Sequence, residues 1–275
     1  MCTEIGCGYK NLDKPLPTAT DQQRRLFLKG MAALPLAVVL ADPKLAAAAG
    51  HKMPTVEVIL PDGSMATADI ALPATTEKAP TVLLIHEWWG LNDQIRAVAN
   101  ELAEQGYIAL AVDLYDGQYG GTPKEAMALM RALNPQRATD TLVAWVDWLK
   151  NHERSNGKVA TLGWCFGGGW SLNASLATSV DATVIYYGNV AKSADDLASL
   201  KSPVLGHFGT LDKNINEEMV AGFESSLKAA GKTDFTLHWY EADHAFANPS
   251  GARYDEADAA LAWERTSEFL AANLS

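Results

Sequence analysis

The sequence has few cysteines and a shortage of positive charge. Only Cys2, Cys7 and Cys165 occur in 275 residues, too few for the disulfide scaffold of a small secreted domain. The 33 acidic residues outnumber the 22 lysines and arginines, which gives a formal charge of −11. A nucleic-acid-binding protein normally presents a basic face to phosphates, so the composition argues against a nucleic-acid partner.

Long apolar runs and metal-ligand patterns are also missing. The apolar stretch from Met31 to Ala41 is eleven residues long and is interrupted by Pro35. A helix needs roughly twenty apolar residues to cross a bilayer, so no stable membrane span is expected. The histidines, cysteines and acids show no metal-ligand spacing, and no G-x-G-x-x-G turn follows a strand, so we expect neither a metal nor a cofactor.

The first fifty residues have the organisation of an export signal. Arg24-Arg25 precede Leu-Phe-Leu-Lys, and the short apolar stretch and the small residues Ala46 to Ala49 follow. This order is typical of a signal peptide, and the arginine pair resembles the twin-arginine signal that sends folded proteins across the bacterial inner membrane. Gln23 stands where that signal often has Ser or Thr.

We therefore predict that residues 1–50 are a leader and short linker that is cleaved, with export machinery as a partner. The mature protein is then periplasmic or secreted. The alternative is an amphipathic helix that lies on the domain. Removal of six basic and four acidic residues would leave a charge of −13 and a single cysteine, Cys165. Such a chain cannot form an intramolecular disulfide, so Cys165 is either a buried apolar residue or a reactive group.

Residues 51–275 alternate strands and helices, as one α/β domain does. The first two expected strands flank Pro61-Asp62-Gly63-Ser64, a turn sequence that predicts a hairpin. The later strands are separated by helices, which predicts a mostly parallel sheet covered on both faces. Strands are expected at 56–60, 68–72, 81–86, 107–112, 158–163, 182–187, 203–208 and 235–240, and helices at 92–105, 123–133, 137–152, 167–178, 216–230 and 254–273.

A glycine-rich turn follows the expected strand 158–163. Its sequence, Gly163-Trp164-Cys165-Phe166-Gly167-Gly168, has the form of a nucleophile elbow with Cys in place of Ser. Glycines at 163 and 167 avoid Cβ clashes where strand and helix converge, and the helix N-terminus favours a thiolate at Cys165. The alternative is a glycine-rich turn around a buried, unreactive cysteine.

Two candidate partners of Cys165 follow later strands. Asp212 follows the strand 203–208, and His244 follows the strand 235–240. This gives the order nucleophile, acid, base of an α/β-hydrolase triad, at the sheet edge where ligands collect. We predict that Cys165 attacks, His244 moves the proton and Asp212 orients the imidazole and supports its charged form.

The loop His86-Glu87-Trp88-Trp89-Gly90 follows the strand residues Thr81–Ile85. In this type of fold the loop supplies one oxyanion-hole donor, so we predict that the hole consists of the backbone N–H groups of Trp88 and Phe166. Glu87 would then lie near Cys165, an unusual place for a carboxylate. The alternative is that Glu87 is an exposed loop acid.

From about residue 55 onward the chain resembles the dienelactone hydrolases, or carboxymethylenebutenolidases. The resemblance rests on the loop just described, on the cysteine elbow, and on the segments Val112-Asp113-Leu114-Tyr115, Gly209-Thr210-Leu211-Asp212 and Asp243-His244-Ala245-Phe246. It implies an α/β-hydrolase fold, with a mostly parallel central sheet of about eight strands and helices on both faces.

The resemblance also implies a function. It implies a hydrolase that cleaves a lactone or carboxylic ester through an acyl-enzyme intermediate, with Cys165, Asp212 and His244 as the triad. It further implies that Glu87 contacts the thiol at rest and modulates its activation.

Departures from the family pattern concern the substrate. Family members hold the substrate carboxylate with two arginines; Lys124 is the nearest match to one, and Asn248 stands at the position of the other. An amide is not equivalent to a guanidinium fork for binding a carboxylate. Arg96 and Arg253 are further candidates for substrate binding.

Two other functions stay open. One is a broad-specificity esterase or thioesterase on the same fold. The other is a non-catalytic binding protein, against which the combination of triad, elbow and oxyanion loop argues. The expected partner is a small-molecule lactone or ester, and the protein is expected to be a monomer.

Overall fold

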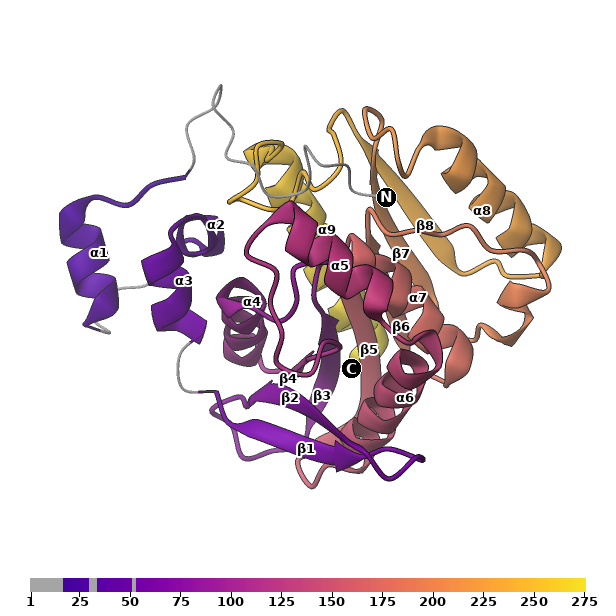
Figure 1. The fold of residues 1–275 in the computed structure, drawn as a ribbon, viewed down its shortest axis with the longest axis horizontal. Coiled ribbons are helices and arrows are strands. Elements are labelled where there is room, and N and C mark those ends of the chain that lie inside the picture. Colours follow the sequence, from indigo (N-terminus) through magenta and orange to yellow (C-terminus); the bar gives the residue numbers. More distant parts are fainter. Residues whose placement is uncertain (1–16, 30–33, 51–52) are drawn as a thin grey trace.

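The computed structural model describes residues 17–29, 34–50 and 53–275 (Figure 1). Within these residues an eight-stranded sheet has the order β1-β2-β4-β3-β5-β6-β7-β8. The pairs β1–β2 and β2–β4 are antiparallel and all others are parallel, so the predicted hairpin and mostly parallel sheet are confirmed. The strands are β1 (Thr55–Ile59), β2 (Met65–Ala71), β3 (Ala79–Ile85), β4 (Ile108–Val112), β5 (Ser155–Trp164), β6 (Ala182–Tyr186), β7 (Val204–Gly209) and β8 (Phe235–Tyr240).

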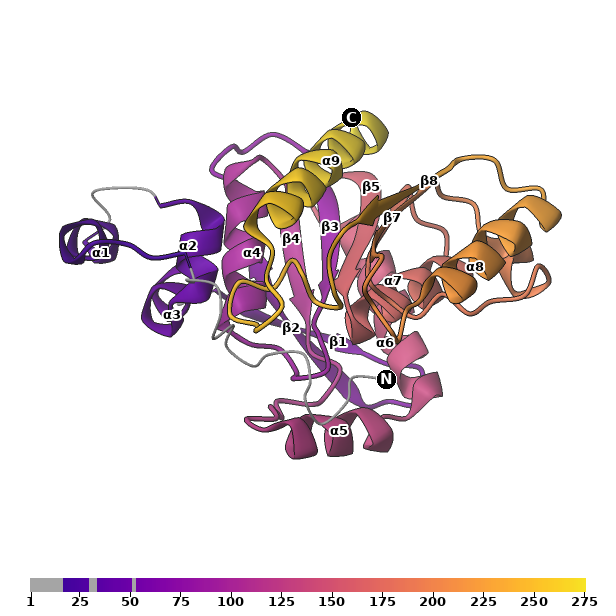
Figure 2. The same cartoon turned by 90° about the horizontal axis from the view of Figure 1, so that it is seen from above.

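Helices cover both faces of the sheet (Figure 2). In β3, Val82 and Leu84 pack into the core beneath α4 and α9, whereas Leu83 and Ile85 face the core beneath α6. This alternation explains the continuous apolar run of β3, because both faces of the strand are buried. The helices of the domain are α4 (Asp93–Glu104), α5 (Pro123–Ala132), α6 (Pro135–Asn151), α7 (Phe166–Ala177), α8 (Glu217–Ala229) and α9 (Glu256–Leu274), with a 3₁₀ turn, η1 (Asp196–Ser199).

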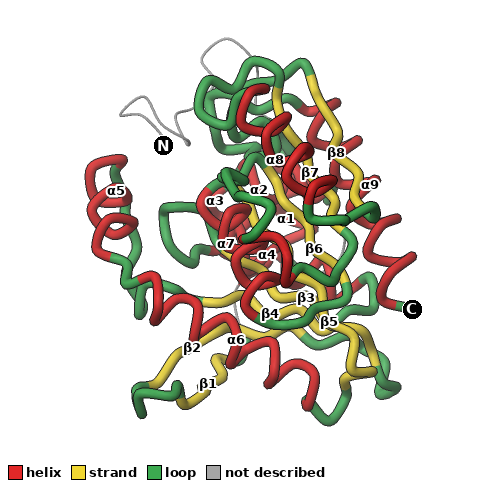
Figure 3. Tube along the Cα trace, turned by 90° about the vertical axis from the view of Figure 1, so that its right-hand side faces the viewer, coloured by secondary structure: helices red, strands yellow, loops and turns green. Residues whose placement is uncertain are grey.

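Local sequence signals set the helix ends. Thr122 and Glu125 form a reciprocal capping box at α5, and Pro123 occupies its first turn. The side chain of Asn92 accepts the backbone N–H of Ile95 at the start of α4. Figure 3 shows α6 passing beside β1, where the two elements are in contact. The helix ranges expected from sequence agree with these elements to within about two residues.

The described parts of residues 1–50 are largely helical, and they lie against the domain except for the first helix, which contacts the third. They form α1 (Asp21–Leu28), α2 (Leu36–Ala41) and α3 (Pro43–Gly50). In α3, Leu45 and Ala46 are each only 1% exposed, and a Cβ at Gly50 would come within 2.8 Å of Arg96 Cβ on α4. Small residues of α3 therefore permit close helix packing. In this respect the structure matches the alternative to a leader, a helix that lies on the domain.

Removal of this segment by export stays a prediction, since it concerns processing rather than the fold. Cys2, Cys7 and the beginning of the apolar stretch at Met31 lie outside the described residues. Within the described ranges, no helix combines the length and apolar character needed to cross a membrane.

Candidate active site

Cys165 occupies a sharp turn between β5 and α7. Its φ of +55° lies in the left-handed region, which is costly for a residue with a side chain. A Cβ at Gly163 would come within 2.0 Å of Gly167 O, and a Cβ at Gly167 within 2.2 Å of Ile85 O. Only glycine fits at these two positions, so the expected reason for the elbow glycines is confirmed.

The surroundings of Cys165 favour a neutral thiol. Burial raises the pKa of Cys165 well above its usual range, and the charge of Glu87 raises this pKa further. The backbone N–H of Phe166, at the first turn of α7, lowers the pKa. This effect of the helix N-terminus acts in the expected direction, but burial and Glu87 outweigh it. The thiol is therefore held in its protonated form until another group removes the proton.

His244 links the thiol to a buried carboxylate. Its Nε2 lies 3.2 Å from Cys165 Sγ, and its Nδ1 lies 2.6 Å from Asp212 Oδ2. Both His244 and Asp212 are 3% exposed. The structure thus brings together the three residues that the sequence placed after β5, β7 and β8.

Close packing of two loops positions this acid–base pair. The backbone N–H of Leu211 donates to Ala242 O at 3.0 Å, and a Cβ at Gly209 would come within 2.1 Å of that same oxygen. Asp212 Oδ1 accepts the backbone N–H groups of Asn214 and Ile215. Burial raises the pKa of Asp212, but the His244 hydrogen bond and these N–H groups more than offset it and lower the pKa below its usual value. Asp212 is therefore an anion that can support an imidazolium.

Glu87 lies on the loop just after β3 and is buried, not exposed. It is 7% exposed, and its Oε2 accepts a hydrogen bond of 2.7 Å from Asn248 Nδ2. Burial raises the pKa of Glu87 to about 7, although the Asn248 hydrogen bond and the charge of Arg253 act in the opposite direction. Near neutral pH this carboxyl therefore exists in both protonation states.

His86 anchors the loop that carries Glu87. Its Nδ1 lies 2.5 Å from Glu87 O, and its Nε2 accepts the backbone N–H of Leu114 at 3.2 Å. Since Nε2 is an acceptor, the proton of the neutral ring is assigned to Nδ1, which donates to Glu87 O. Burial lowers the pKa of His86, which favours this neutral form. The sequence alone did not identify these partners of His86.

The predicted substrate-binding residues lie in different places. Asn248 lines a cavity beside Glu87, whereas Lys124 is exposed on α5. Arg96 donates to Asp69 at 2.7 Å, and Arg253 lies 3.5 Å from Asp243. Among the described residues, the lining of this cavity includes none of Lys124, Arg96 and Arg253.

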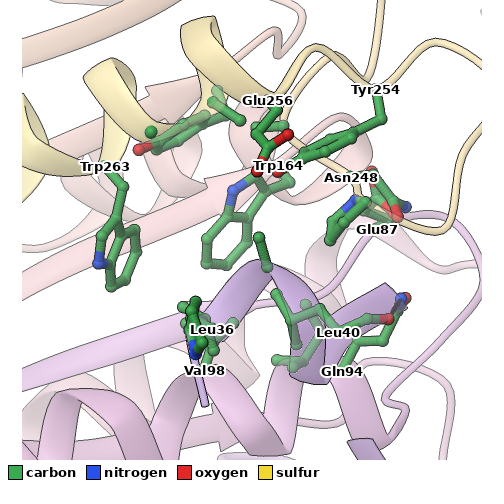
Figure 4. Close-up of a pocket in the computed structure, with 18 of the residues that line it drawn as sticks. Leu36, Leu40, Glu87, Gln94, Val98, Trp164, Asn248, Tyr254, Glu256 and Trp263 are labelled. Carbon is green, nitrogen blue, oxygen red and sulfur yellow. Dashed lines mark hydrogen bonds between the residues drawn. The ribbon is translucent and has the colours of Figure 1, made fainter. Parts of the chain in front are cut away.

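The cavity lies between α2, α4 and α9 and has a volume of about 390 Å³. Figure 4 shows Glu87 and Asn248 side by side at one end of it and Trp263 of α9 toward the other. Trp164, the residue before Cys165, lines its middle. Trp88, whose backbone N–H is a predicted oxyanion donor, is fully buried in the hydrophobic core that also contains Trp164. The part of the chain that the structure describes holds no group of three or more His, Cys, Asp or Glu side chains suited to a metal ion.

Known proteins resemble this chain in sequence and fold. The model of the dienelactone hydrolase family matches residues 67–274. A carboxymethylenebutenolidase of Pseudomonas putida is 31% identical over 225 residues, covering 76% of this chain and 92% of the relative. Carboxymethylenebutenolidase 1 of Cupriavidus pinatubonensis is 28% identical over 226 residues, covering 78% of this chain and 95% of the relative.

A solved structure agrees with these matches. A candidate dienelactone hydrolase from Klebsiella pneumoniae superposes with a TM-score of 0.71 at 26% identity, covering 80% of this chain and 99% of that chain. The eight-stranded arrangement with helices on both faces is therefore the α/β-hydrolase fold, as the sequence predicted.

Proposed function

The chain belongs to the dienelactone hydrolase family, and we propose that it cleaves its lactone or carboxylic ester through an acyl-enzyme formed on Cys165. Membership of this family makes the protein a lactone or ester hydrolase. The observation that carries the proposed mechanism is the contact series from Asp212 through His244 to Cys165, with separations of 2.6 Å and 3.2 Å.

The first half of the reaction transfers the acyl group to sulfur. His244 Nε2 accepts the thiol proton while Cys165 Sγ bonds to the carbonyl carbon. The tetrahedral intermediate then expels the alkoxide, which takes the proton from His244. For a lactone, the released hydroxyl stays attached to the acyl chain. Asp212 stabilises the imidazolium that exists between these two proton transfers.

The second half regenerates the thiol. His244 accepts a proton from water, whose oxygen attacks the thioester carbonyl, and the thiolate leaves and recovers the proton. In both halves the carbonyl oxygen becomes negative. The backbone N–H of Phe166 lies close enough to the sulfur to lower the pKa of Cys165, which supports the assignment of this N–H to the oxyanion hole. The backbone N–H of Trp88 is the second donor in this proposal.

Glu87 regulates the thiol in this proposal. Its negative charge opposes formation of the thiolate, and burial of the sulfur acts in the same direction. Substrate that enters beside Glu87 and Asn248 changes the surroundings of the carboxyl and lets His244 remove the thiol proton. The resting enzyme therefore avoids a permanently ionised thiol, which is the species that reacts with oxidants.

The environment of Asn248 favours a broad substrate range. At the position where the family has an arginine, this amide binds the enzyme's own Glu87. A substrate carboxylate is therefore not required at that point, which favours esters without a carboxylate alongside lactones. Lys124, exposed on α5, is the remaining candidate for an anionic substrate group.

We further propose that the protein acts in the periplasm or outside the cell as a monomer, after export directed by Arg24 and Arg25. The order of basic, apolar and small residues in the leader supports this localisation. Exposed large apolar side chains such as Ile59 of β1, Leu211 of the loop after β7 and Leu261 of α9 come from separate segments, which supports a monomer.

Replacement of the sulfur tests the mechanism. Cys165→Ala should lower kcat/KM for p-nitrophenyl acetate by on the order of 10⁴–10⁶ without unfolding, because the nucleophile is lost. In the full-length chain, Cys2→Ala and Cys7→Ala are controls that should keep the unsubstituted rate. Mass spectrometry of the quenched unsubstituted enzyme should show an acetyl adduct on Cys165. Retention of more than a few per cent of the activity by folded Cys165→Ala would exclude Cys165 as the nucleophile.

A further inference from the structure

The cavity between α2, α4 and α9 has an apolar wall on three sides. Leu36 and Leu40 come from α2, Val98 from α4 and Trp263 from α9, with Trp164 of β5 between them (Figure 4). Its volume of about 390 Å³ falls in the range of small-molecule pockets, roughly 300–1,000 Å³. The space is therefore large enough for part of a substrate.

One end of this cavity adjoins the reactive residues. Glu87 lies at that end, and Trp164 immediately precedes Cys165 in the chain. Tyr187 also lines the cavity, and its ring centroid is 5.2 Å from that of His244. The lining of the cavity therefore extends to the neighbours of Cys165 and His244, although neither of these two residues lines it.

Charge restricts what can occupy the space. Among the described residues that line the cavity there is no Lys, Arg or His, whereas Glu87, Glu256 and Glu264 are present. A carboxylate on the substrate would lose water and meet like charge there, while an alkyl chain would gain contacts with Leu, Val and Trp. We propose that this cavity binds the uncharged, apolar acyl chain of the ester, an inference that rests on the proposed acyl-enzyme at Cys165.

Until it is cleaved, the segment before the domain lines part of this site. Gln94 Nε2 of α4 donates to Leu40 O at 2.8 Å, which ties α2 to the domain. Leu45 and Ala46 of α3 are almost completely buried next to it. In the full-length chain α2 therefore closes one side of the cavity. Loss of residues 1–50 would open that side and weaken the discrimination between acyl chains.

A series of p-nitrophenyl esters from acetate to octanoate tests the site in the full-length chain, with its N-terminus verified by mass spectrometry. Each CH₂ that enters the cavity should raise kcat/KM by about three- to fourfold until the space is filled. Ala259→Phe, which narrows the cavity from α9, should lower the hexanoate-to-acetate ratio of kcat/KM by about tenfold. Ala257→Phe, on the exposed side of α9, is the matched control and should keep the ratio.

A cation in the cavity should reverse its preference. Leu40→Arg should raise the ratio of kcat/KM for p-nitrophenyl hemiadipate to that for the hexanoate by about tenfold. Leu28→Arg, at an α1 side chain that is 54% exposed, is the control and should leave the ratio unchanged. A rise in the absolute kcat/KM for the hemiadipate, unlike a fall in that for the hexanoate, could not come from misfolding.

Different results would overturn the acyl-chain site and the proposed mechanism. Flat chain-length profiles that Ala259→Phe and Leu40→Arg leave unaltered would overturn the acyl-chain site, while acetate hydrolysis through Cys165 stood. Hydrolysis that persists in Cys165→Ala would overturn the proposed mechanism, and with it the placement of the substrate's acyl chain in the cavity.

Discussion

Asn248 donates a hydrogen bond of 2.7 Å from Nδ2 to Oε2 of Glu87, and both side chains are buried. The other oxygen of Glu87, Oε1, has no hydrogen-bond partner among the described residues. A neutral amide supports the ionised carboxyl only in part, so burial prevails and the pKa of Glu87 is raised to about 7. This pair therefore sets the charge beside Cys165 at neutral pH.

Removal of the amide should raise the pKa of Glu87 further. In Asn248→Ala the ionised form loses its hydrogen bond, while the burial that favours the protonated form remains. We expect the titration of the Glu87 carboxyl, followed by ¹³C NMR and assigned with Glu87→Gln, to move to higher pH. Ser250→Ala, which removes a hydroxyl that donates to Asn248 Oδ1, should cause a smaller shift. A titration at unchanged or lower pH in Asn248→Ala would contradict the assignment.

Glu87 should make the protein less stable as the pH rises. Between about pH 4.5 and 7 the folded state keeps a proton on Glu87 that the unfolded chain releases, so the free energy of unfolding falls across that window. The loss is on the order of 3 kcal/mol and is complete above pH 7. Glu87→Gln should lack this contribution. In urea unfolding, the free energy of unfolding of Glu87→Gln relative to that of the unsubstituted protein should therefore be greater at pH 8 than at pH 5. Parallel pH profiles would show that Glu87 titrates normally.

The thiol should react slowly with alkylating agents, and Glu87 should be part of the reason. Iodoacetamide reacts with the thiolate, whose formation burial and the Glu87 charge both oppose. In Glu87→Gln the labelling of Cys165, followed by mass spectrometry, should be faster. The difference should grow from pH 6 to pH 8 because Glu87 ionises over that range. Turnover should fall as well. Labelling as rapid as that of an activated protease cysteine, and equal in both proteins, would exclude this role of Glu87.

The acid and the base should act as one unit. His244→Ala removes the proton acceptor, whereas Asp212→Asn keeps a side chain of the same shape and loses the charge that orients His244. We expect Asp212→Asn to have the milder loss of kcat/KM, and the double variant to be little worse than His244→Ala. Losses that multiply in the double variant would indicate independent roles.

The arginine pair should direct export. Changing both Arg24 and Arg25 to Lys keeps the charge but removes the guanidinium groups, and the full-length chain should then accumulate in the cytoplasm. Fractionation with an antibody to the domain measures this, and Lys29→Arg is a control that should leave export unchanged. Normal delivery of the Lys-Lys variant to the periplasm would reject the twin-arginine assignment.

The sequence by itself determined the features that are local along the chain. Apolar runs of strand length, helical periodicity and turn residues predicted the strands and helices, because backbone geometry links each pattern to its neighbours within a few residues. The elbow around Cys165 could be predicted in the same way, since Gly163 and Gly167 lie within four residues of each other. The positions of Asp212 and His244 followed because parallel strands bring their carboxyl ends to one edge of the sheet.

Contacts between loops and helices that are distant in sequence leave no periodic pattern in the sequence. Only the tertiary structure decided them. Asn248 and Glu87 are 161 residues apart, and their hydrogen bond depends on how two loops pack against the core. The same holds for Leu40, which reaches the cavity because α2 and α3 lie on α4. Such contacts depend on the fit of surfaces from distant segments, which side-chain shape and burial determine and which spacing along the chain does not record.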